Sequence, residues 1–475
     1  MSNATNTALE RIENLLDAGS FVEVGAGVRS RSTNFNLATQ DTPKDGVITG
    51  YGVIDGNLVY VYSQDSSVLG GAVGEMHGKK IAALYDMALK MGAPIIGLLD
   101  STGLRLQEGV DALNGFAEIY SKQSMCSGVI PSISVVFGNA GGALNILTEL
   151  SDFAFMEEDA SLYISAKDSV PGDYTEKDDN TSASFQSKKV GSVDFVGTKD
   201  EIVAEVRKLI SLLPSNNEDN DSYDECTDSL NRLNVDAKGS YGDVRLLIAD
   251  ISDDSLVFET KKDHAREMAT AFIRLNGQTV GVIANAVKDT DEEGKGITYP
   301  STLSTRGARK AKVFLDFCDA FSIPVLTIVN MTGFENSMCA EKNLGRVVSR
   351  LVYSYANATV PKVTLITDKA YGSAYMVMGS KALGADQVFA WEGAKIAMMD
   401  SDLASQILGA DKNEEERLAI SKEYDELQGS AMSAASRGLV DTIIDPTETR
   451  KYLIGAFEML FTKRESRPDK KHGTK

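Results

Sequence analysis

Residues 93–103, APIIGLLDSTG, and residues 323–333, IPVLTIVNMTG, decide the fold because they are two copies of one pattern. In each copy a proline precedes an apolar strand that ends in a glycine turn. A second pair follows at the same offset of 230 residues, since SGVIPSISVVFGNAGGA at 127–143 matches NATVPKVTLITDKAYGSA at 357–374. Strands that alternate with helices predict an α/β fold, and the repeat predicts two domains of that fold.

The segments around these copies suggest where the domains begin and end. Residues 51–65 and 272–286 each alternate around an Asp-Gly or Asn-Gly pair, which is a strong hairpin signal. Between the copies, the stretch PSNNEDNDSYDECTDS at 214–229 loses the apolar rhythm and is typical of a linker. We therefore predict an N-terminal domain over 1–215, an acidic linker over 216–242 and a C-terminal domain over 243–475.

Composition excludes several classes of protein. The formal net charge of -20 in 475 residues argues against nucleic acid as a partner, because such binding normally starts from a basic surface. The N-terminus lacks the basic-then-apolar order of a signal peptide. The uncharged stretch 126–148 is broken by Pro131 and a glycine pair, so we expect buried core rather than a membrane span. Four widely spaced cysteines fit a reducing cytoplasm: Cys126, Cys226, Cys318 and Cys339.

The glycine turns carry the clearest chemical signal. A turn between a strand and a helix exposes N–H groups that no helical carbonyl satisfies, and such turns suit oxyanions. They could instead merely permit tight connections, but four turns at repeated positions favour a functional role. Only three histidines are present, so a catalytic triad or a histidine metal site is hard to assemble, and no metal is expected. No phosphate-binding loop or dinucleotide fingerprint appears.

Longer stretches resemble a known family. They are SQDSSVLGGAVGEMHGKK at 63–80, GAPIIGLLDSTGLRLQEGVDAL at 92–113, SGVIPSISVVFGNAGGAL at 127–144, FCDAFSIPVLTIVNMTGF at 317–334, ATVPKVTLITDKAYGSAYMVMGSKALGADQVFAW at 358–391 and RGLVDTIIDPTETRKYL at 437–453. Together they resemble, in order and over nearly the whole chain, the biotin-dependent acyl-CoA carboxyltransferases, which include the β subunits of propionyl-CoA carboxylases. The resemblance implies two tandem crotonase-like domains, assembled as a hexamer with active sites between subunits.

The resemblance also implies a site. Acyl-CoA is expected on the first domain and biotin on the second. The thioester oxyanion hole would use the backbone at Leu104 and Gly142, and the biotin-side hole would use Gly333 and Ala374. Other residues expected to contact substrate are Gly71, Ala72, Gly103, Arg105, Gly141, Phe334, Gly372, Ser373 and Met376. The implied mechanism needs no side-chain base, because the biotin ureido nitrogen takes the α-proton and backbone donors hold both negative oxygens.

Three positions depart from the family pattern. Leu104 stands where the family has a smaller residue, Ser373 replaces a glycine, and Met376 lies at a position thought to sense acyl length. Residues 399–405 also replace a more glycine-rich stretch. These departures leave the size of the acyl group open.

The partners follow from what the sequence lacks. It contains no Met-Lys-Met biotinylation sequence and no ATP-binding loop, so biotin is expected on a separate carrier protein, the biotin carboxyl carrier protein. A carboxylase would also need a biotin carboxylase, whereas a sodium-pumping decarboxylase running the same step in reverse would need a membrane subunit. A crotonase-like hydratase or isomerase and a non-catalytic scaffold are the remaining alternatives. A hydratase would need acidic residues at a glycine turn, and none is evident.

Overall fold

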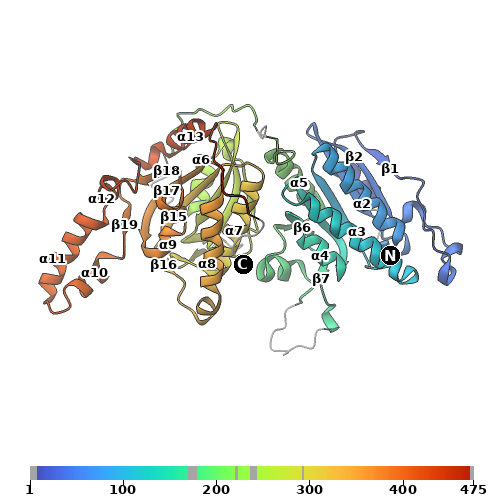
Figure 1. The fold of residues 1–475 in the computed structure, drawn as a ribbon, viewed down its shortest axis with the longest axis horizontal. Coiled ribbons are helices and arrows are strands. Elements are labelled where there is room, and N and C mark those ends of the chain that lie inside the picture. The colour runs from blue at the N-terminus through green and yellow to red at the C-terminus, as the bar shows by residue number, and fades with distance from the viewer. Residues whose placement is uncertain (1–7, 170–178, 220–222, 236–242, 291–293, 471–475) are drawn as a thin grey trace. The chain divides into compact units, whose positions relative to one another are not determined.

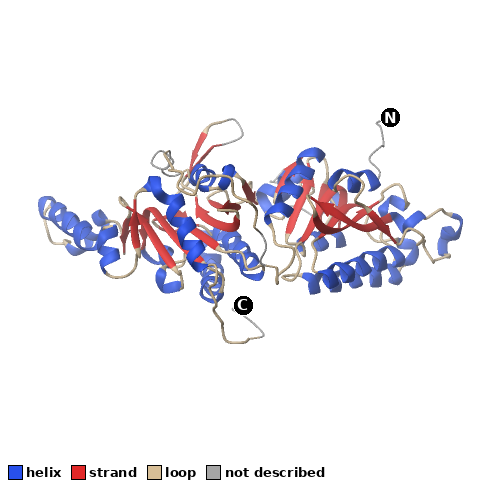
Figure 2. Cartoon of the chain, turned by 90° about the horizontal axis from the view of Figure 1, so that it is seen from above, coloured by secondary structure: helices blue, strands red, loops and turns tan. Residues whose placement is uncertain are grey.

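The computed structural model describes residues 8–169, 179–219, 223–235, 243–290 and 294–470. It divides into two compact units, one of Met1–Ser222 with Lys261–His264 and one of Tyr223–Thr260 with Ala265–Lys475. Each unit is a twisted sheet flanked by helices (Figures 1 and 2). No helix in the described ranges is long and apolar enough to cross a membrane.

The first unit contains a sheet in the order β1-β2-β3-β4-β5-β6-β8, with β7 paired to β5. Strands β1 to β3 are antiparallel, and β3 to β8 are parallel. Its elements are α1 (Ala8–Leu15), β1 (Val22–Val24), β2 (Val47–Ile54), β3 (Asn57–Gln64), α2 (Glu75–Met91), β4 (Ile95–Ser101), α3 (Val110–Cys126), β5 (Ser132–Gly141), α4 (Ala143–Glu149), β6 (Phe153–Glu157), β7 (Ser161–Tyr163), β8 (Phe195–Gly197) and α5 (Lys199–Leu212).

The second unit repeats this plan in the order β9-β10-β11-β15-β17-β18-β20, with β19 paired to β17. Its elements are α6 (Val244–Ile251), β9 (Val257–Thr260), β10 (Met268–Leu275), β11 (Gln278–Asn285), β12 (Lys288–Thr290), β13 (Gly296–Thr298), β14 (Thr302–Leu303), α7 (Thr305–Ala320), β15 (Val325–Met331), β16 (Gly333–Phe334), α8 (Met338–Asn357), β17 (Lys362–Tyr371), α9 (Gly372–Met376), β18 (Gln387–Trp391), β19 (Lys395–Ala397), α10 (Ser401–Leu408), α11 (Glu414–Tyr424), α12 (Ala431–Ser436), β20 (Thr442–Ile444) and α13 (Thr449–Leu460).

The register of the sheets confirms the internal repeat. Ile95 of β4 lies opposite Ser132 of β5, and Val325 of β15 lies opposite Lys362 of β17, so both pairs obey the 230-residue offset. Both pairings shift register near their carboxyl ends, after Leu99 in β4 and after Val329 in β15. The predicted α/β class with two tandem crotonase-like domains is confirmed.

Each unit has its own apolar core between sheet and helices. In the first unit α2 and α3 pack against each other, and in the second α7 and α8 do the same. Serines set the starts of two of these helices, because the Ser304 and Ser337 side chains accept hydrogen bonds from the first turns of α7 and α8. These helices lead into or out of the glycine turns, so the core positions the turns.

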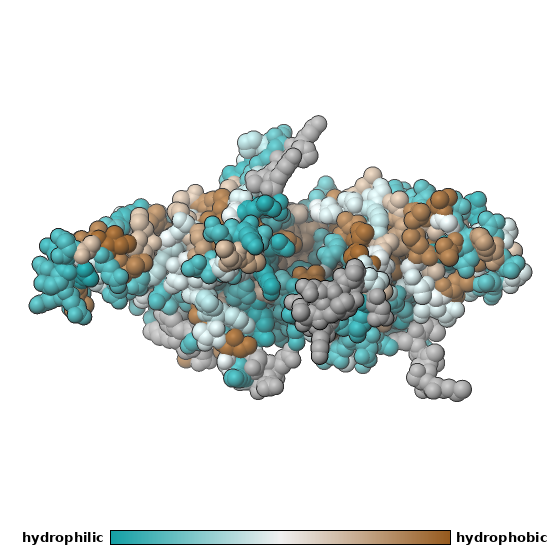
Figure 3. Space-filling view, turned by 90° about the horizontal axis from the view of Figure 1, so that it is seen from below, coloured by the Kyte–Doolittle hydropathy of each residue, from teal (hydrophilic) through white to brown (hydrophobic). Residues whose placement is uncertain are grey.

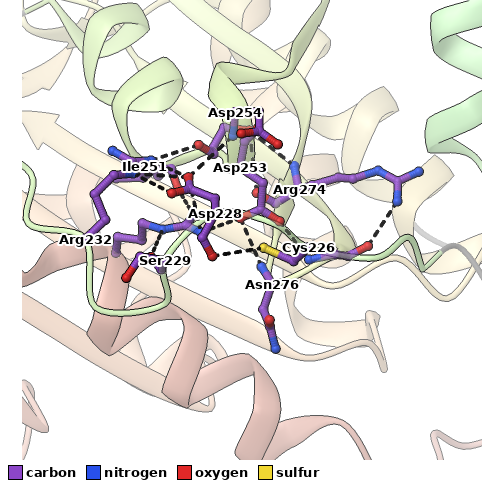
Figure 4. A network of polar contacts seen from close by, with 12 residues as sticks. Cys226, Asp228, Ser229, Arg232, Ile251, Asp253, Asp254, Arg274 and Asn276 are labelled. Atoms are coloured by element: carbon purple, nitrogen blue, oxygen red, sulfur yellow. Dashed lines mark hydrogen bonds and ion pairs between the residues drawn. The ribbon is translucent and has the colours of Figure 1, made fainter.

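The described parts of the predicted linker make specific contacts. The Asn216 side chain donates to the Gly92 carbonyl at 2.8 Å in the first unit. Residues 223–235 belong to the second unit, and Asp228 and Arg232 join the network of polar contacts around Asp253 that Figure 4 shows. The Arg450 guanidinium forms an ion pair with Asp253 at 2.6 Å. Arg450 also donates to the Ile251 carbonyl, and its own N–H donates to Asn234. Residues 220–222 and 236–242 lie outside the described residues.

Candidate functional site

The first glycine turn of unit one follows β4. Gly103 has a φ of 102°, a backbone conformation that glycine adopts easily. The Val73 N–H donates to the Gly103 carbonyl at 2.8 Å, and the Arg105 N–H donates to the Val73 carbonyl at 2.9 Å. Because backbone groups alternate along an extended segment, the Leu104 N–H between them points away from Val73. The Leu104 N–H therefore takes no part in this pairing.

The second turn of unit one joins β5 to α4 at Gly142, where φ is 60°. Here the structure differs from the expectation, because the Gly142 N–H donates to the Tyr163 carbonyl at 2.8 Å. The next two N–H groups, on Ala143 and Leu144, belong to the first turn of α4 and have no intrahelical acceptor. Free donors thus begin one residue after the predicted one.

The first turn of unit two has the same backbone pattern. β16 pairs with β14, and the Glu335 N–H donates to the Leu303 carbonyl at 3.0 Å. This bond is the 230-residue equivalent of the Arg105 bond to Val73. Phe334 therefore takes the place of Leu104, and Gly333, which the sequence analysis assigned as a donor, takes the place of Gly103.

The second turn of unit two begins α9. Gly372 has a φ of 61°, close to that of Gly142. Ser373 and Ala374 lie in the first helical turn, so their N–H groups have no intrahelical acceptor. Ala374 is buried, whereas Met376 is 54% exposed. Ala374, which was predicted as a donor, thus lies in the first turn of α9.

Strand pairing brings the two turns of each unit together. Ser101 at the end of β4 lies opposite Ala140, just before the turn at Gly142. Met331 at the end of β15 likewise lies opposite Ala370, and α9 contacts β16. Each unit therefore presents two sets of free N–H groups at neighbouring strand ends, which is the arrangement required to hold one oxyanion.

A buried ion cluster supports the turn of unit one. Arg105, expected at the substrate, is fully buried and forms ion pairs with Asp45 at 2.5 Å and Glu108 at 2.8 Å. It also donates to the Ala72 carbonyl at 2.8 Å. Glu108 accepts from the Glu75 N–H at the start of α2. The cluster connects the turn to α2 and to the chain before β2. Arg105 therefore supports the turn from its buried side.

Burial governs the ionisation of this cluster. Desolvation raises the pKa of Asp45, although Arg105 opposes the shift. Burial also acts to raise the pKa of Glu108, but hydrogen bonds from Glu75 and Arg105 outweigh it and lower the pKa. Burial lowers the pKa of His77 to about 3, so this imidazole stays neutral. Asp45 and Glu108 were not predicted from the sequence, where the local signal for the cluster is the Arg105–Glu108 spacing of three residues.

Gly71 and Gly141, which were expected to contact substrate, lie where the chain packs too closely to allow a side chain. A side chain on Gly71 would come within 2.4 Å of the Asp100 carbonyl, so Gly71 permits the close approach of its loop to β4. A side chain on Gly141 would come within 2.6 Å of the Tyr163 ring. Both glycines shape the turns through tight packing.

Comparison with known proteins identifies the family. Residues 1–474 match the family model described as "Carboxyl transferase domain". The chain belongs to the carboxyl transferase family. Among relatives of this carboxyl transferase, the propionyl-CoA carboxylase beta chain of Roseobacter denitrificans is 39% identical, over 98% of this chain and 92% of that protein. The methylmalonyl-CoA decarboxylase subunit alpha of Propionigenium modestum is 40% identical over the same shares.

A solved structure gives the same answer for the fold of this carboxyl transferase. The transcarboxylase 12S hexamer, determined with hydrolysed methylmalonyl-coenzyme A bound, has a TM-score of 0.91 and 35% identity, and the match covers 98% of this chain and 92% of that chain. The protein is therefore an enzyme, the carboxyltransferase subunit of a biotin-dependent acyl-CoA carboxylase or decarboxylase. The predicted family and enzyme class are confirmed.

Proposed function

We propose that this carboxyl transferase moves a carboxyl group from biotin, held on a separate carrier protein, to a short acyl-CoA, either acetyl-CoA or propionyl-CoA. The proposal rests on one observation, which is that the two glycine turns of unit one and the two glycine turns of unit two share one backbone pattern. Each unit offers free N–H groups at neighbouring strand ends, and the reaction has two oxygens that gain negative charge.

The two turns of each unit together hold one of these oxygens. In unit one, the Leu104 N–H and the first N–H groups of α4, beginning at Ala143, hold the thioester oxygen, while Gly103, Gly141 and Gly142 shape the turns. In unit two, Phe334 and Ala374 hold the ureido oxygen, with Gly333, Gly372 and Ser373 around them. Met376, exposed at the end of α9, lines the cleft.

The chain contributes electrostatic stabilisation and positioning. Biotin, when bound, supplies the carboxyl group and accepts the substrate proton. Backbone N–H groups in a water-poor cleft stabilise the enolate oxygen without reorganising, and one such donor contributes about 3 kcal/mol. His77 is fully buried, its ring nitrogens lie within hydrogen-bonding distance of Gln64 and the Asp45 carbonyl, and burial lowers its pKa to about 3, so we assign it no role in proton transfer.

The reverse direction is the second candidate. Similarity to the methylmalonyl-CoA decarboxylase subunit is as high as to the propionyl-CoA carboxylase chain, at 40% and 39% identity. The same turns stabilise the same enolate whether a carboxyl group is added or removed. The direction is therefore set by the partner, a biotin carboxylase for the first candidate or a membrane decarboxylase subunit for the second.

We also propose a homo-hexamer with a separate biotin carboxyl carrier protein. Support comes from the solved relative, which is a hexamer, and from apolar surface on the helical projection of unit two. Leu403, Ile407 and Leu408 of α10 are each more than half exposed, and Figure 3 shows brown, apolar side chains on that end of the molecule. Exposed apolar patches of this kind are typical of subunit interfaces.

The test is decarboxylation of malonyl-CoA and methylmalonyl-CoA by purified protein, with and without biotin, followed as acyl-CoA product. Ala143→Pro and Ala374→Pro each remove one N–H in the first turn of a helix, where proline is tolerated. We expect each to lower kcat by about 10²-fold to 10³-fold. Gly142→Pro is less informative, because a φ of 60° excludes proline and the variant would misfold locally.

The controls are Ala143→Gly and Ala374→Gly, which keep the N–H and should keep most activity. Proline variants as active as wild type would contradict the assignment of donors. A folded protein with no activity on any acyl-CoA would favour a scaffold. Direction is tested by adding biotinylated carrier, biotin carboxylase, ATP and bicarbonate, where net carboxylation of propionyl-CoA supports the first candidate.

A further inference from the structure

A series of side-chain hydrogen bonds links the two glycine turns of unit one. The Tyr163 hydroxyl, on β7, donates to the Asn139 side-chain oxygen at 3.0 Å. The Asn139 side-chain nitrogen, on β5, donates at 2.9 Å to the Ser101 carbonyl, at the end of β4. Because a carbonyl can only accept, the Asn139 amide fits between its two partners in one orientation. One amide group therefore joins three neighbouring strands close to the turns.

Both ends of this series reach a turn. At one end, the Ser101 hydroxyl accepts from the Gly103 N–H at 3.1 Å, one residue before the first proposed donor. At the other end, the Tyr163 carbonyl accepts from the Gly142 N–H at 2.8 Å, again one residue before a proposed donor. Ser101, Asn139 and Tyr163, called the turn bridge from here on, thus connect the two sides of the thioester hole.

The turn bridge lies where the regular pairing of β4 with β5 is interrupted. The register shifts after Leu99, so that residues 137–139 of β5 stand opposite Asp100 alone. A bulge of this kind disrupts the ladder of backbone hydrogen bonds. The ladder therefore does not fix the spacing of the two turns at this point, whereas the turn bridge spans the bulge.

The surroundings of the turn bridge make its hydrogen bonds costly to lose. Ser101 is 1% exposed, and Asn139 and Tyr163 are half-buried. Gly141 lies opposite Tyr163 in the pairing of β5 with β7 and packs against its ring. Hydrogen bonds that are shielded from water are strong, and removing one partner leaves the other unsatisfied.

Unit two has other residues at the three places of the turn bridge. They are Met331, Lys369 and Ala397, the first two by the 230-residue offset and the third by the pairing of β19 with β17. Met331 and Ala397 carry no hydroxyl or amide group in their side chains. In unit two the Asn330 side chain spans the matching bulge, since its oxygen accepts from the Lys369 N–H at 3.3 Å. The turn bridge therefore belongs to the unit that we assign to acyl-CoA.

We propose that Asn139 and Tyr163 are positioning residues, which hold the Leu104 and Ala143 N–H groups at the separation that one enolate oxygen requires. The inference rests on the proposed function, because it takes these two N–H groups as the donors. Neither side chain of the pair touches substrate. Donors stabilise the transition state only if they are in place before charge develops, so loosening either turn should lower kcat more than it changes KM.

The kinetic test uses Tyr163→Phe, which removes one hydroxyl and keeps the ring, and Asn139→Ala, which removes the amide. In biotin-dependent decarboxylation of malonyl-CoA and methylmalonyl-CoA, we expect kcat to fall about fivefold to tenfold for the first and about tenfold to 100-fold for the second, with KM within about twofold of wild type. Because both side chains act through one bridge, the double variant should fall no further than Asn139→Ala. Tyr355→Phe is the matched control, since it removes a hydroxyl that lies 3.0 Å from the Thr327 hydroxyl in unit two, and it should keep the kcat of wild type.

Hydrogen exchange tests the turn bridge without any activity. In both variants the amides of residues 101–104 and 142–144 should exchange about fivefold faster, whereas Tyr355→Phe should leave them unchanged. Faster exchange at both turns in a protein that decarboxylates no acyl-CoA would support the bridge and contradict the proposed function. An active wild type whose two variants keep their kcat, or losses that multiply in the double variant, would overturn the positioning role and leave the proposed function intact. Unchanged exchange at both turns overturns the bridge in either case.

Discussion

The two glycine turns that follow β4 and β15 share one backbone and differ in what supports it. In unit one, Arg105 is buried with Asp45 and Glu108, so the turn is fixed to the interior by charge. In unit two, Glu335 stands at the equivalent position and faces a cavity. The repeat therefore preserves the backbone geometry of the turns while the side chains behind them have diverged. A buried ion cluster supports the turn of unit one, whereas Glu335 lines a cavity in unit two.

Unit two has its own buried arginine, but at another place. Arg450 lies at the start of α13 and is fully buried, and it forms ion pairs with Asp253 and Asp228. Figure 4 labels these two aspartates. Arg450 connects α13 to residues 223–235 and to the end of α6. Arg105 therefore stabilises the glycine turn that follows β4, and Arg450 holds residues 223–235 next to α6 and α13.

The largest effect is expected from Arg105→Ala. Removing one member of a buried ion cluster leaves Asp45 and Glu108 without their cation, which typically costs about 3–5 kcal/mol, and we expect about 4 kcal/mol here. Urea unfolding followed by circular dichroism measures the loss. Because the cluster supports the Leu104 turn, kcat should also fall, with a smaller change in KM.

The control for this variant is Arg29→Ala, which removes an exposed ion pair with Asp41. Exposed pairs contribute about 0–1 kcal/mol, so this variant should unfold like wild type. If the Arg105 and Arg29 variants were equally stable, the buried ion cluster would stabilise unit one no more than an exposed ion pair does.

Sequence reasoning predicted the fold because the repeat is carried by local patterns. The strands and turns at 93–103 and 323–333 are visible as apolar runs, prolines and glycines. It did not predict the role of Arg105, because its partner Asp45 lies 60 residues away in the chain. It also did not predict that the Gly142 N–H donates to the Tyr163 carbonyl or that Phe334 takes the place of Leu104, since both depend on tertiary pairing.

A somewhat smaller loss is expected from Arg450→Ala. The change leaves Asp253 without its ion pair and removes the donor to the Ile251 carbonyl, so we expect about 3 kcal/mol. Limited proteolysis should also cut within 223–235 faster, because Arg450 holds that segment. Arg464→Ala, an exposed arginine near the same end of the chain, should change neither. Unchanged proteolysis of the Arg450 variant would show that the segment is held by other contacts.

The smallest effect is expected at two aspartates that lie at matching places in the two sheets, just before β6 and just before β18. Asp152 in unit one accepts from the Ser132 N–H, and Asp386 in unit two accepts from the Lys362 N–H, both at 2.8 Å. Only Asp386 has a lysine beside it, since Lys463 lies 2.8 Å away. Burial raises the pKa of Asp152 to about 6, although the hydrogen bonds from Ser132 oppose the shift.

The sign of the pH effect follows from this difference. The unfolded Asp152 titrates near its ordinary value of about 3.9, so between that pH and about 6 the folded protein binds more protons. Stability therefore falls as pH rises through this window and stays lower above it. Asp152→Asn keeps an acceptor for Ser132 but cannot ionise, so it should be more stable than wild type by about 1–2 kcal/mol at pH 7.5 and similar at pH 4.5. Asp386→Asn loses the Lys463 pair and should be less stable at pH 7.5. Urea unfolding from pH 4.5 to 8 measures both, and parallel pH curves for wild type and Asp152→Asn would mean that the charge at Asp152 is solvated well enough for its burial not to matter.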